Sequence, residues 1–304
     1  MALFPYDELK YYSFGLRAGV SNLFDNGLKL GAKKTFGKIA QPINSYTRFP
    51  EYYFFDKAIR ESLGSAPTDR PTRILDVGSP KMMGLYLAFN TRAELALTDI
   101  SELNVDEYRL MWRGLEPKAR GKARFSIQDA RSLPFEDGKF DIVYSMSVIE
   151  HIEGAAGDTQ AVGEFIRVLR PGGLLILSVP FGNRYAEQQR VGFSYTMGET
   201  GHSQAHFFQR IYDQPALENR VLRHAGKLEQ VSLTTVGRKN QWMSRSFSSL
   251  GENARGVLGF VNPMLSAAGN RTFPGMNSSF PVEYGEILSV HDVYGDLIMK
   301  GRKL

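Results

Sequence analysis

The chain contains no cysteine among its 304 residues. This absence excludes disulfide bonds, zinc sites built from thiolates and cysteine nucleophiles, and it favours a reducing compartment. No stretch approaches the roughly 18 consecutive apolar residues that a membrane-spanning helix needs. The N-terminal MALFPYDELKYY carries acidic residues where a signal peptide would carry basic ones. We therefore expect a cytoplasmic protein.

Positive charge is in only moderate excess, with 37 Lys and Arg against 32 Asp and Glu. The basic residues are spread along the chain rather than gathered with aromatic residues on one dense face, so nucleic acid is not the expected partner. A local exception is the lysine-containing segment 31–50. We interpret this segment as a solvated connector, and the alternatives are a lid over a ligand site or a peripheral contact with an anionic membrane.

Short apolar runs alternate with longer amphipathic stretches from residue 73 onward, as in parallel strands joined by helices. Strands are predicted at 73–77, 94–98, 123–127, 140–145, 174–179, 228–236 and 296–300. Helices are predicted at 82–89, 105–113, 160–169 and 213–224. The sequence therefore predicts an α/β fold with a Rossmann-like, doubly wound, mostly parallel seven-stranded sheet and helices on both faces.

The domain organisation is expected to be one main domain with additions. Residues 1–70 are predicted to form an N-terminal helical extension or lid, with candidate helices at 7–16, 21–30 and 50–63. Residues 71–304 form the main domain, with insertions at about 181–212 and 240–290. The first insertion is too long for a plain connection, so we expect it to fold over the active face.

Carboxylates end the first three predicted strands. RILDVGS places Asp76 and Gly78 at the carboxyl end of the first strand, where open α/β sheets bind ligands in a crevice. TDIS ends the second strand with Asp99, which is positioned to accept both hydroxyls of a ribose. After the third strand, Asp129 is positioned to accept from an adenine amino group while the Ala130 amide meets a ring nitrogen. This pattern predicts an adenosine site.

Four segments occur here in the order typical of one family: ILDVG, the acidic end of LALTDIS, DARSLPF, and the pair DIVYSMSVIEHI and LRPGGLLILSVP. Residues 73–180, about a third of the chain, thereby resemble the class I S-adenosylmethionine-dependent methyltransferases, particularly the methyltransferase domain type 11 group. The resemblance implies S-adenosylmethionine as cofactor. It implies a cofactor-binding set of Asp76, Gly78, Ser79, Asp99, Ile100, Asp129, Ala130, Ser145 and Met146.

One segment departs from the family pattern. The family usually follows its first glycine with two more at alternate positions, whereas GSPKMMG has Pro80 and Met82 there. This difference affects how closely the backbone can approach the methionine part of the cofactor. It leaves open the alternative that the chain is a catalytically degenerate binding protein. A nicotinamide-dependent oxidoreductase is a second alternative, although G-x-G-x-x-G is missing.

Methyl transfer is an in-line displacement for which the protein mainly supplies alignment and exclusion of water. A hydroxyl acceptor benefits from a general base, and our candidates in order are His202, His206 and His151. Tyr185 and Tyr195 in the first insertion are candidates for contacting the acceptor. We expect no metal and, as acceptor, a small-molecule or sugar/glycan hydroxyl.

Overall fold

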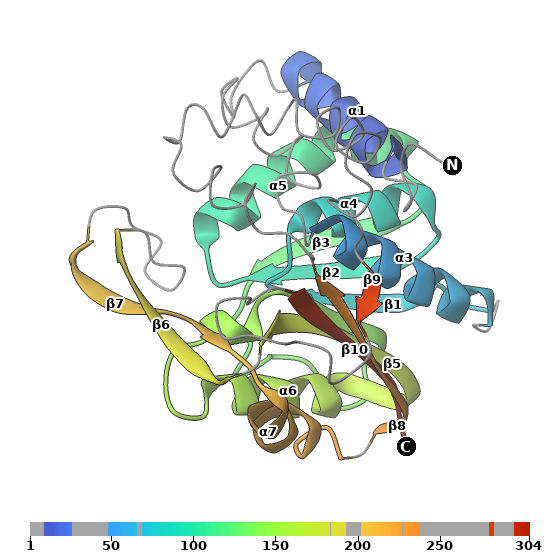
Figure 1. Ribbon diagram of the computed structural model, residues 1–304. Coiled ribbons are helices and arrows are strands. Elements are labelled where there is room, and N and C mark those ends of the chain that lie inside the picture. The colour runs from blue at the N-terminus through green and yellow to red at the C-terminus, as the bar shows by residue number, and fades with distance from the viewer. Residues whose placement is uncertain are drawn as a thin grey trace.

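The computed structural model describes residues 9–25, 48–65, 69–182, 184–192, 202–226, 228–237, 280–282 and 295–304. Figure 1 shows these residues arranged as a central sheet with helices on both sides. The basic segment up to residue 47, Tyr195 and most of the insertion at 240–290 lie outside the described residues.

The main sheet has the strand order β3-β2-β1-β4-β5-β10-β8-β9. The first five strands are parallel, and β10 runs antiparallel to both β5 and β8. Their bounds are β1 (Arg73–Val77), β2 (Glu94–Asp99), β3 (Lys122–Ile127), β4 (Phe140–Met146), β5 (Leu169–Phe181), β8 (Leu228–Gly237), β9 (Phe280–Val282) and β10 (Gly295–Lys303). The predicted doubly wound, mostly parallel sheet is confirmed. All seven predicted strands are present, and β9 extends the sheet by one antiparallel strand.

Two layers of helices cover the sheet because its buried strands are apolar on both faces. One layer contains α1 (Leu9–Asp25), α3 (Arg48–Gly64), α4 (Lys81–Asn90) and α5 (Glu102–Leu115), followed by the short η2 (Glu116–Lys118). The other contains α6 (Gly157–Val168), α7 (Gln214–Leu217) and the π-helical turn η4 (Glu218–Leu222). In β1, Ile74 packs in the hydrophobic core that includes α4, whereas Leu75 and Val77 pack in the core that includes α6 on the other face. This alternation fixes which helices lie on which face.

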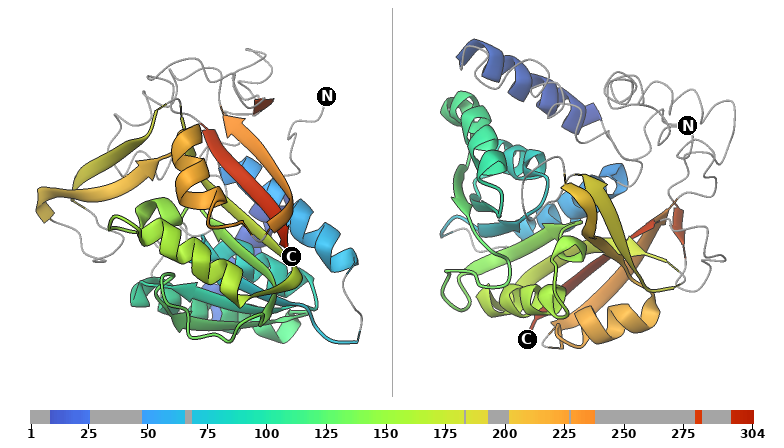
Figure 2. Two further views of the ribbon diagram at one scale, coloured as in Figure 1. Left: turned by 90° about the horizontal axis from the view of Figure 1, so that it is seen from below. Right: turned by 90° about the vertical axis from the view of Figure 1, so that its left-hand side faces the viewer.

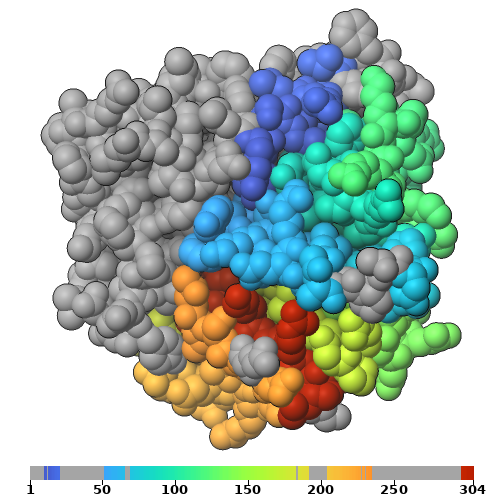
Figure 3. Space-filling view, turned by 90° about the vertical axis from the view of Figure 1, so that its right-hand side faces the viewer, coloured from blue at the N-terminus to red at the C-terminus, as the bar shows by residue number. Residues whose placement is uncertain are grey.

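The N-terminal helices pack on the main domain. Two separate helices were expected at 7–16 and 21–30, but α1 is one continuous helix. Tyr11, Phe14 and Ala18 have the spacing of one helical face and are buried, so packing holds the helix through the predicted break. In Figure 3, α3 lies across β10.

The first insertion forms a hairpin of β6 (Ala186–Gly192) and β7 (His202–Ile211) that is separate from the main sheet. Figures 1 and 2 show it projecting from the body. Its strands were missed because AEQQRVG is polar and has a single β-branched residue, Val191. The helix predicted at 213–224 is also different, since it breaks into α7 and η4.

Among the described residues, no helix is long and apolar enough to cross a bilayer.

An ionic cluster at the start of β4 ties the chain around Asp141. The two terminal guanidinium nitrogens of Arg70 donate to the two oxygens of Asp141 at 2.7 and 2.8 Å. The Arg73 amide donates to Asp141 at 2.8 Å, and the Arg170 guanidinium donates to it as well. Burial opposes ionisation, but these donors outweigh it and lower the pKa of Asp141 from 3.8 to about 2.

This pKa predicts an acid-sensitive contribution to stability. Because the folded-state pKa lies below the unfolded value, ionised Asp141 stabilises the protein above pH 3.8, and the contribution is lost as pH falls through about 2. We expect Asp141→Asn to lower the free energy of unfolding at neutral pH by about 2 kcal/mol. Urea titrations of both proteins from pH 7 downward should show their difference shrinking toward pH 2. A constant difference would contradict this account.

Candidate active site

The carboxyl ends of β1 and β4 meet where the strand order reverses. The connection from β1 leads to β2 on one side, and the connection from β4 leads to β5 on the other side. Open α/β sheets bind ligands at such a reversal of strand order. At this edge Gly78 has φ +68° and donates its amide to the Thr98 carbonyl at 2.8 Å. A Cβ at Gly78 would lie 2.5 Å from Cγ1 of Val148. Both the backbone conformation and the space therefore require glycine here.

Asp99 ends β2 in a setting suited to a nucleoside. Its side chain is 12% exposed, and its Oδ1 accepts the Ser101 amide at 3.0 Å. Large apolar side chains are exposed at the neighbouring ends of β2 and β3 and at the start of α5, namely Ile100, Ile127 and Leu103. Apolar walls with a few convergent polar groups are typical of small-ligand sites.

Asp129 follows β3 and is held by Arg131. Arg131 donates to Oδ2 at 2.6 Å and from its amide to Oδ1 at 2.9 Å. The hydrogen bonds from Arg131 are the main cause of the lowered pKa of Asp129. The carboxylate is therefore ionised at neutral pH and acts only as an acceptor. Ala130 beside it is partly buried.

Four of the predicted cofactor contacts are enclosed in the structure. The side chains of Asp76, Ser79, Ser145 and Met146 are buried near the carboxyl ends of β1 and β4. Ser145 donates to the Val77 carbonyl at 3.1 Å, and the Met146 amide donates to Ser79 Oγ at 2.9 Å. These buried residues hold the ends of β1 and β4 together, whereas the other predicted contacts are partly or fully exposed, namely Gly78, Asp99, Ile100, Asp129 and Ala130.

The Asp76 carboxylate is surrounded by donors. Lys81 Nζ lies 2.7 Å from Oδ1, the Ser79 amide donates to the same oxygen, and the Tyr144 hydroxyl donates to Oδ2 at 2.5 Å. Burial raises the pKa of Asp76, and Lys81 opposes this shift. Burial also raises the pKa of the Tyr144 hydroxyl well above 10, so it remains a donor. Lys81 was not among the residues predicted for the site.

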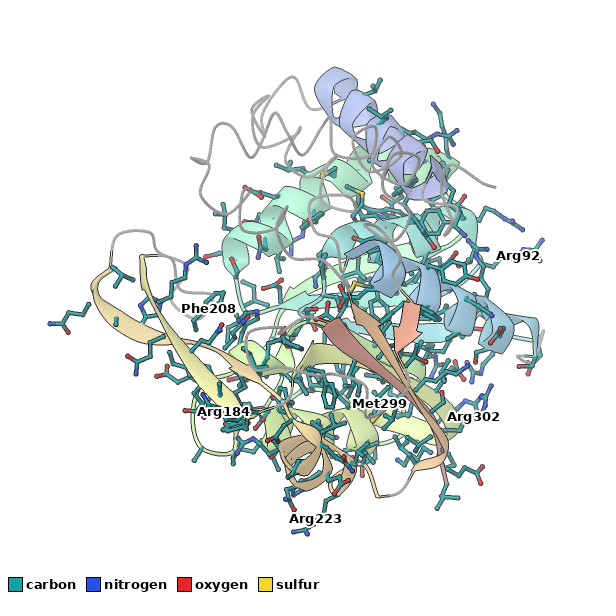
Figure 4. All side chains as sticks on the ribbon, viewed as in Figure 1. Arg92, Arg184, Phe208, Arg223, Met299 and Arg302 are labelled. Atoms are coloured by element: carbon teal, nitrogen blue, oxygen red, sulfur yellow. The ribbon has the colours of Figure 1, made fainter. Side chains whose placement is uncertain are left out.

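The predicted histidines lie in two places. His151 ends the 3-10 turn η3 (Ile149–His151) after β4, and its Nδ1 lies 2.7 Å from the Phe208 carbonyl on β7. Its Nε2 lies 3.7 Å from Oε1 of buried Glu150. His206 is half-buried on β7, and the side chain of His202 lies outside the described residues. Figure 4 labels Phe208 on the hairpin beside the body of the protein.

Tyr185 lies at the foot of the hairpin. Its amide donates to Asp213 at 2.9 Å, its hydroxyl donates to Glu187 at 2.7 Å, and its ring packs edge-on against Tyr212. These contacts connect the start of β6 to the segment after β7.

Glu51 was not predicted and reaches the site from α3. Its buried Oε1 accepts the Ser147 hydroxyl at 2.6 Å and the Ser178 hydroxyl. Ser147 directly follows β4 and has φ +51°, a left-handed conformation that is rare outside glycine. Glu51 therefore joins α3 to a strained turn at the carboxyl end of β4 and to β5.

The part of the chain that contains β1 to β5 is similar in sequence to known proteins. Residues 75–177 match the family model described as "Methyltransferase domain". The chain is 48% identical over 56 residues to a chloroplastic tocopherol O-methyltransferase of Arabidopsis thaliana, covering 18% of this chain and 15% of the relative. It is 28% identical over 169 residues to a sterol 24-C-methyltransferase of Gibberella zeae, covering 51% and 42%. The chain thus spans less than half the length of these relatives.

Solved structures that align with this chain include the cyclase SpnF, with 19% sequence identity and a TM-score of 0.47. The alignment covers 82% of this chain and 80% of SpnF. A methyltransferase from Methanosarcina mazei matches at 17% identity and TM-score 0.47 over 80% and 97%. The family match over residues 75–177 confirms the resemblance: this part of the chain is a methyltransferase domain similar to the class I S-adenosylmethionine-dependent methyltransferases. The family match sets the nicotinamide alternative aside.

Proposed function

We propose that this protein transfers a methyl group from S-adenosylmethionine to a hydroxyl of a small-molecule or glycan-like acceptor. The observation that carries the proposal is the partly exposed Asp99 carboxylate at the end of β2, among exposed apolar side chains and next to the strand β1 at which the strand order reverses. The donor supplies a methyl group already activated by a sulfonium. The protein then has to bind, align and exclude water.

The residues at the ends of β1 to β3 fit the adenosine part of this cofactor. Asp99 accepts the ribose hydroxyls, because an ionised carboxylate can take two donors. Ile100 offers an apolar surface to the adenine ring, since its side chain is 45% exposed. Asp129 accepts from the adenine amino group beside its contacts with Arg131, and the Ala130 amide meets a ring nitrogen. Gly78 lets the backbone turn sharply beneath the ligand.

His151 is the base that the geometry favours. Its Nδ1 faces a backbone carbonyl, which only accepts, so Nδ1 carries the hydrogen of the neutral ring. Nε2 is then the basic nitrogen, and Glu150 at 3.7 Å stabilises the ring once it has taken a proton. His202 and His206 stay alternative candidates for the base, and Tyr185 and Tyr195 stay candidates for contacting the acceptor.

The named relatives support a small-molecule acceptor. One is called a tocopherol O-methyltransferase and the other a sterol 24-C-methyltransferase, so they differ in the atom that is methylated. Our choice of an oxygen acceptor rests on the arrangement of His151. A peripheral membrane contact through the basic segment 31–50 also stays a prediction, and it would suit an apolar acceptor.

The test has two stages with the purified chain. Isothermal titration with S-adenosylmethionine and S-adenosylhomocysteine should show that both bind. Incubation with methyl-labelled donor and a panel of phenols, sterols, prenyl alcohols and sugars should then transfer label to a hydroxyl compound. Absence of binding contradicts the proposed function, whereas binding without transfer to any acceptor favours the catalytically degenerate alternative.

A further inference from the structure

Lys81 is a buried cation at the first position of α4, directly after the loop that follows β1. Its side chain is 1% exposed, which is rare for lysine unless its ammonium is paired. Its Nζ lies 2.7 Å from Asp76 Oδ1, 2.6 Å from the Ser79 carbonyl and 3.7 Å from Asp99 Oδ2. One ammonium therefore contacts the end of β1, the loop that follows it and the end of β2.

The loop held by this ammonium has no glycine at positions 80 and 82. Ser79 is fixed at three atoms: its amide donates to Asp76, its carbonyl accepts from Lys81 and its hydroxyl accepts the Met146 amide. Pro80 limits the backbone further, with φ −56°. Charge and hydrogen bonds thus determine a loop conformation for which other sequences rely on glycine.

We propose that Lys81 is a positioning residue for the cofactor, a role that rests on the proposed function. It holds the Ser79 carbonyl on one side and the Asp99 carboxylate on the other. The loop that faces the amino acid part of the ligand and the acid that faces its ribose are thereby kept in one arrangement. Lys81 acts through Ser79 and Asp99 and needs no contact with the ligand.

A simpler role would be to neutralise Asp76, because a buried carboxylate without a cation is strongly destabilising. The two roles differ when both charges are removed. Lys81→Met alone should lower the Tm by on the order of 10 °C under either role. In the double variant Asp76→Asn with Lys81→Met, the new side-chain amide can accept from the Ser79 amide through its oxygen and donate to Tyr144 through its nitrogen. We expect this double variant to recover most of the lost stability.

The deciding measurement is ligand affinity of the double variant at a temperature where circular dichroism shows it folded. We expect S-adenosylhomocysteine to bind about tenfold more weakly than to the wild type, and adenosine, which lacks the amino acid part, to lose affinity by a smaller factor. Lys122→Met is the matched control, since Lys122 pairs with Glu94 at the exposed opposite end of the sheet. It should leave both affinities unchanged.

The outcomes separate the proposal from the proposed function. A wild-type protein that binds neither ligand contradicts the function itself. A wild type that binds, together with a double variant of unchanged affinity for S-adenosylhomocysteine, overturns the positioning role and leaves Lys81 as the counterion of Asp76. Loss for S-adenosylhomocysteine without any loss for adenosine overturns the part assigned to Asp99, and with it the proposal as stated.

Discussion

Replacing Asp99 with alanine is expected to weaken the binding of S-adenosylhomocysteine by about a hundredfold, because two hydroxyls lose a charged acceptor and each such bond contributes about 1.5 kcal/mol or more. Asp99→Asn should have a smaller effect. Its amide oxygen can still accept the Ser101 amide, which donates to Oδ1 at 3.0 Å in the wild type, but the negative charge is gone. Isothermal titration of the three proteins provides the comparison.

A matched control lies on the same strand. Glu94 begins β2, at the end of the sheet away from the site, and pairs with exposed Lys122 at 3.3 Å. Glu94→Ala should therefore bind the ligand as the wild type does, with little change in stability. If Asp99→Ala binds within about threefold of the wild type, Asp99 does not hold the ribose. The adenosine site would then have to be sought elsewhere on the sheet edge.

The sheet could be predicted because its buried strands are short apolar runs, and the first two, β1 and β2, are each followed by a helix. This local pattern is independent of what packs on it, and strands such as β1 and β2 begin at the predicted residues. The hairpin could not be predicted in the same way. AEQQRVG is polar, and its strand conformation depends on antiparallel pairing with β7, a contact between segments that sequence periodicity does not reveal.

Some residues of the candidate site could likewise be predicted from the sequence, and others could not. Asp76 and Asp99 lie in the last residues of β1 and β2, and Gly78 and Asp129 come shortly after β1 and β3. Their place at the sheet edge therefore follows from the strand prediction. Glu51 reaches Ser147 and Ser178 from 96 and 127 residues away, and no local pattern signals such a contact. Lys81 had a local signal. It lies between Pro80 and Met82, which replace the family's glycines, and a lysine in that segment can pair with Asp76 or Asp99.

The histidine ranking shows what geometry adds. From the sequence, His202 and His206 stood first because the first insertion was expected to cover the active face. In the structure the hairpin brings the Phe208 carbonyl to His151, and this bond selects the nitrogen that holds the hydrogen. We therefore place His151 first in the proposed function, and the order of the three histidines stays a prediction for the substitutions below to test.

Replacing His151 with asparagine is expected to lower kcat for a hydroxyl acceptor by about a hundredfold to ten-thousandfold, the usual contribution of a general base. The asparagine amide can still donate to the Phe208 carbonyl and keep the hairpin attached, so the affinity for S-adenosylhomocysteine should stay at the wild-type value. Label transfer to the acceptor found in the panel measures kcat, and titration measures affinity.

The pH dependence distinguishes a base from a packing residue. A histidine base works only in its neutral form, so the wild-type kcat should rise with pH until the ring is deprotonated, and the residual activity of His151→Asn should lack that rise. His206→Asn, made on the hairpin, is the comparison that tests the earlier candidate. Because Glu150 lies near Nε2, Glu150→Gln should reduce kcat less than His151→Asn does, since it removes the support of the charged ring and leaves the base itself. Wild-type kcat in His151→Asn, combined with loss in His206→Asn, would move the proton acceptor from the sheet edge to the hairpin.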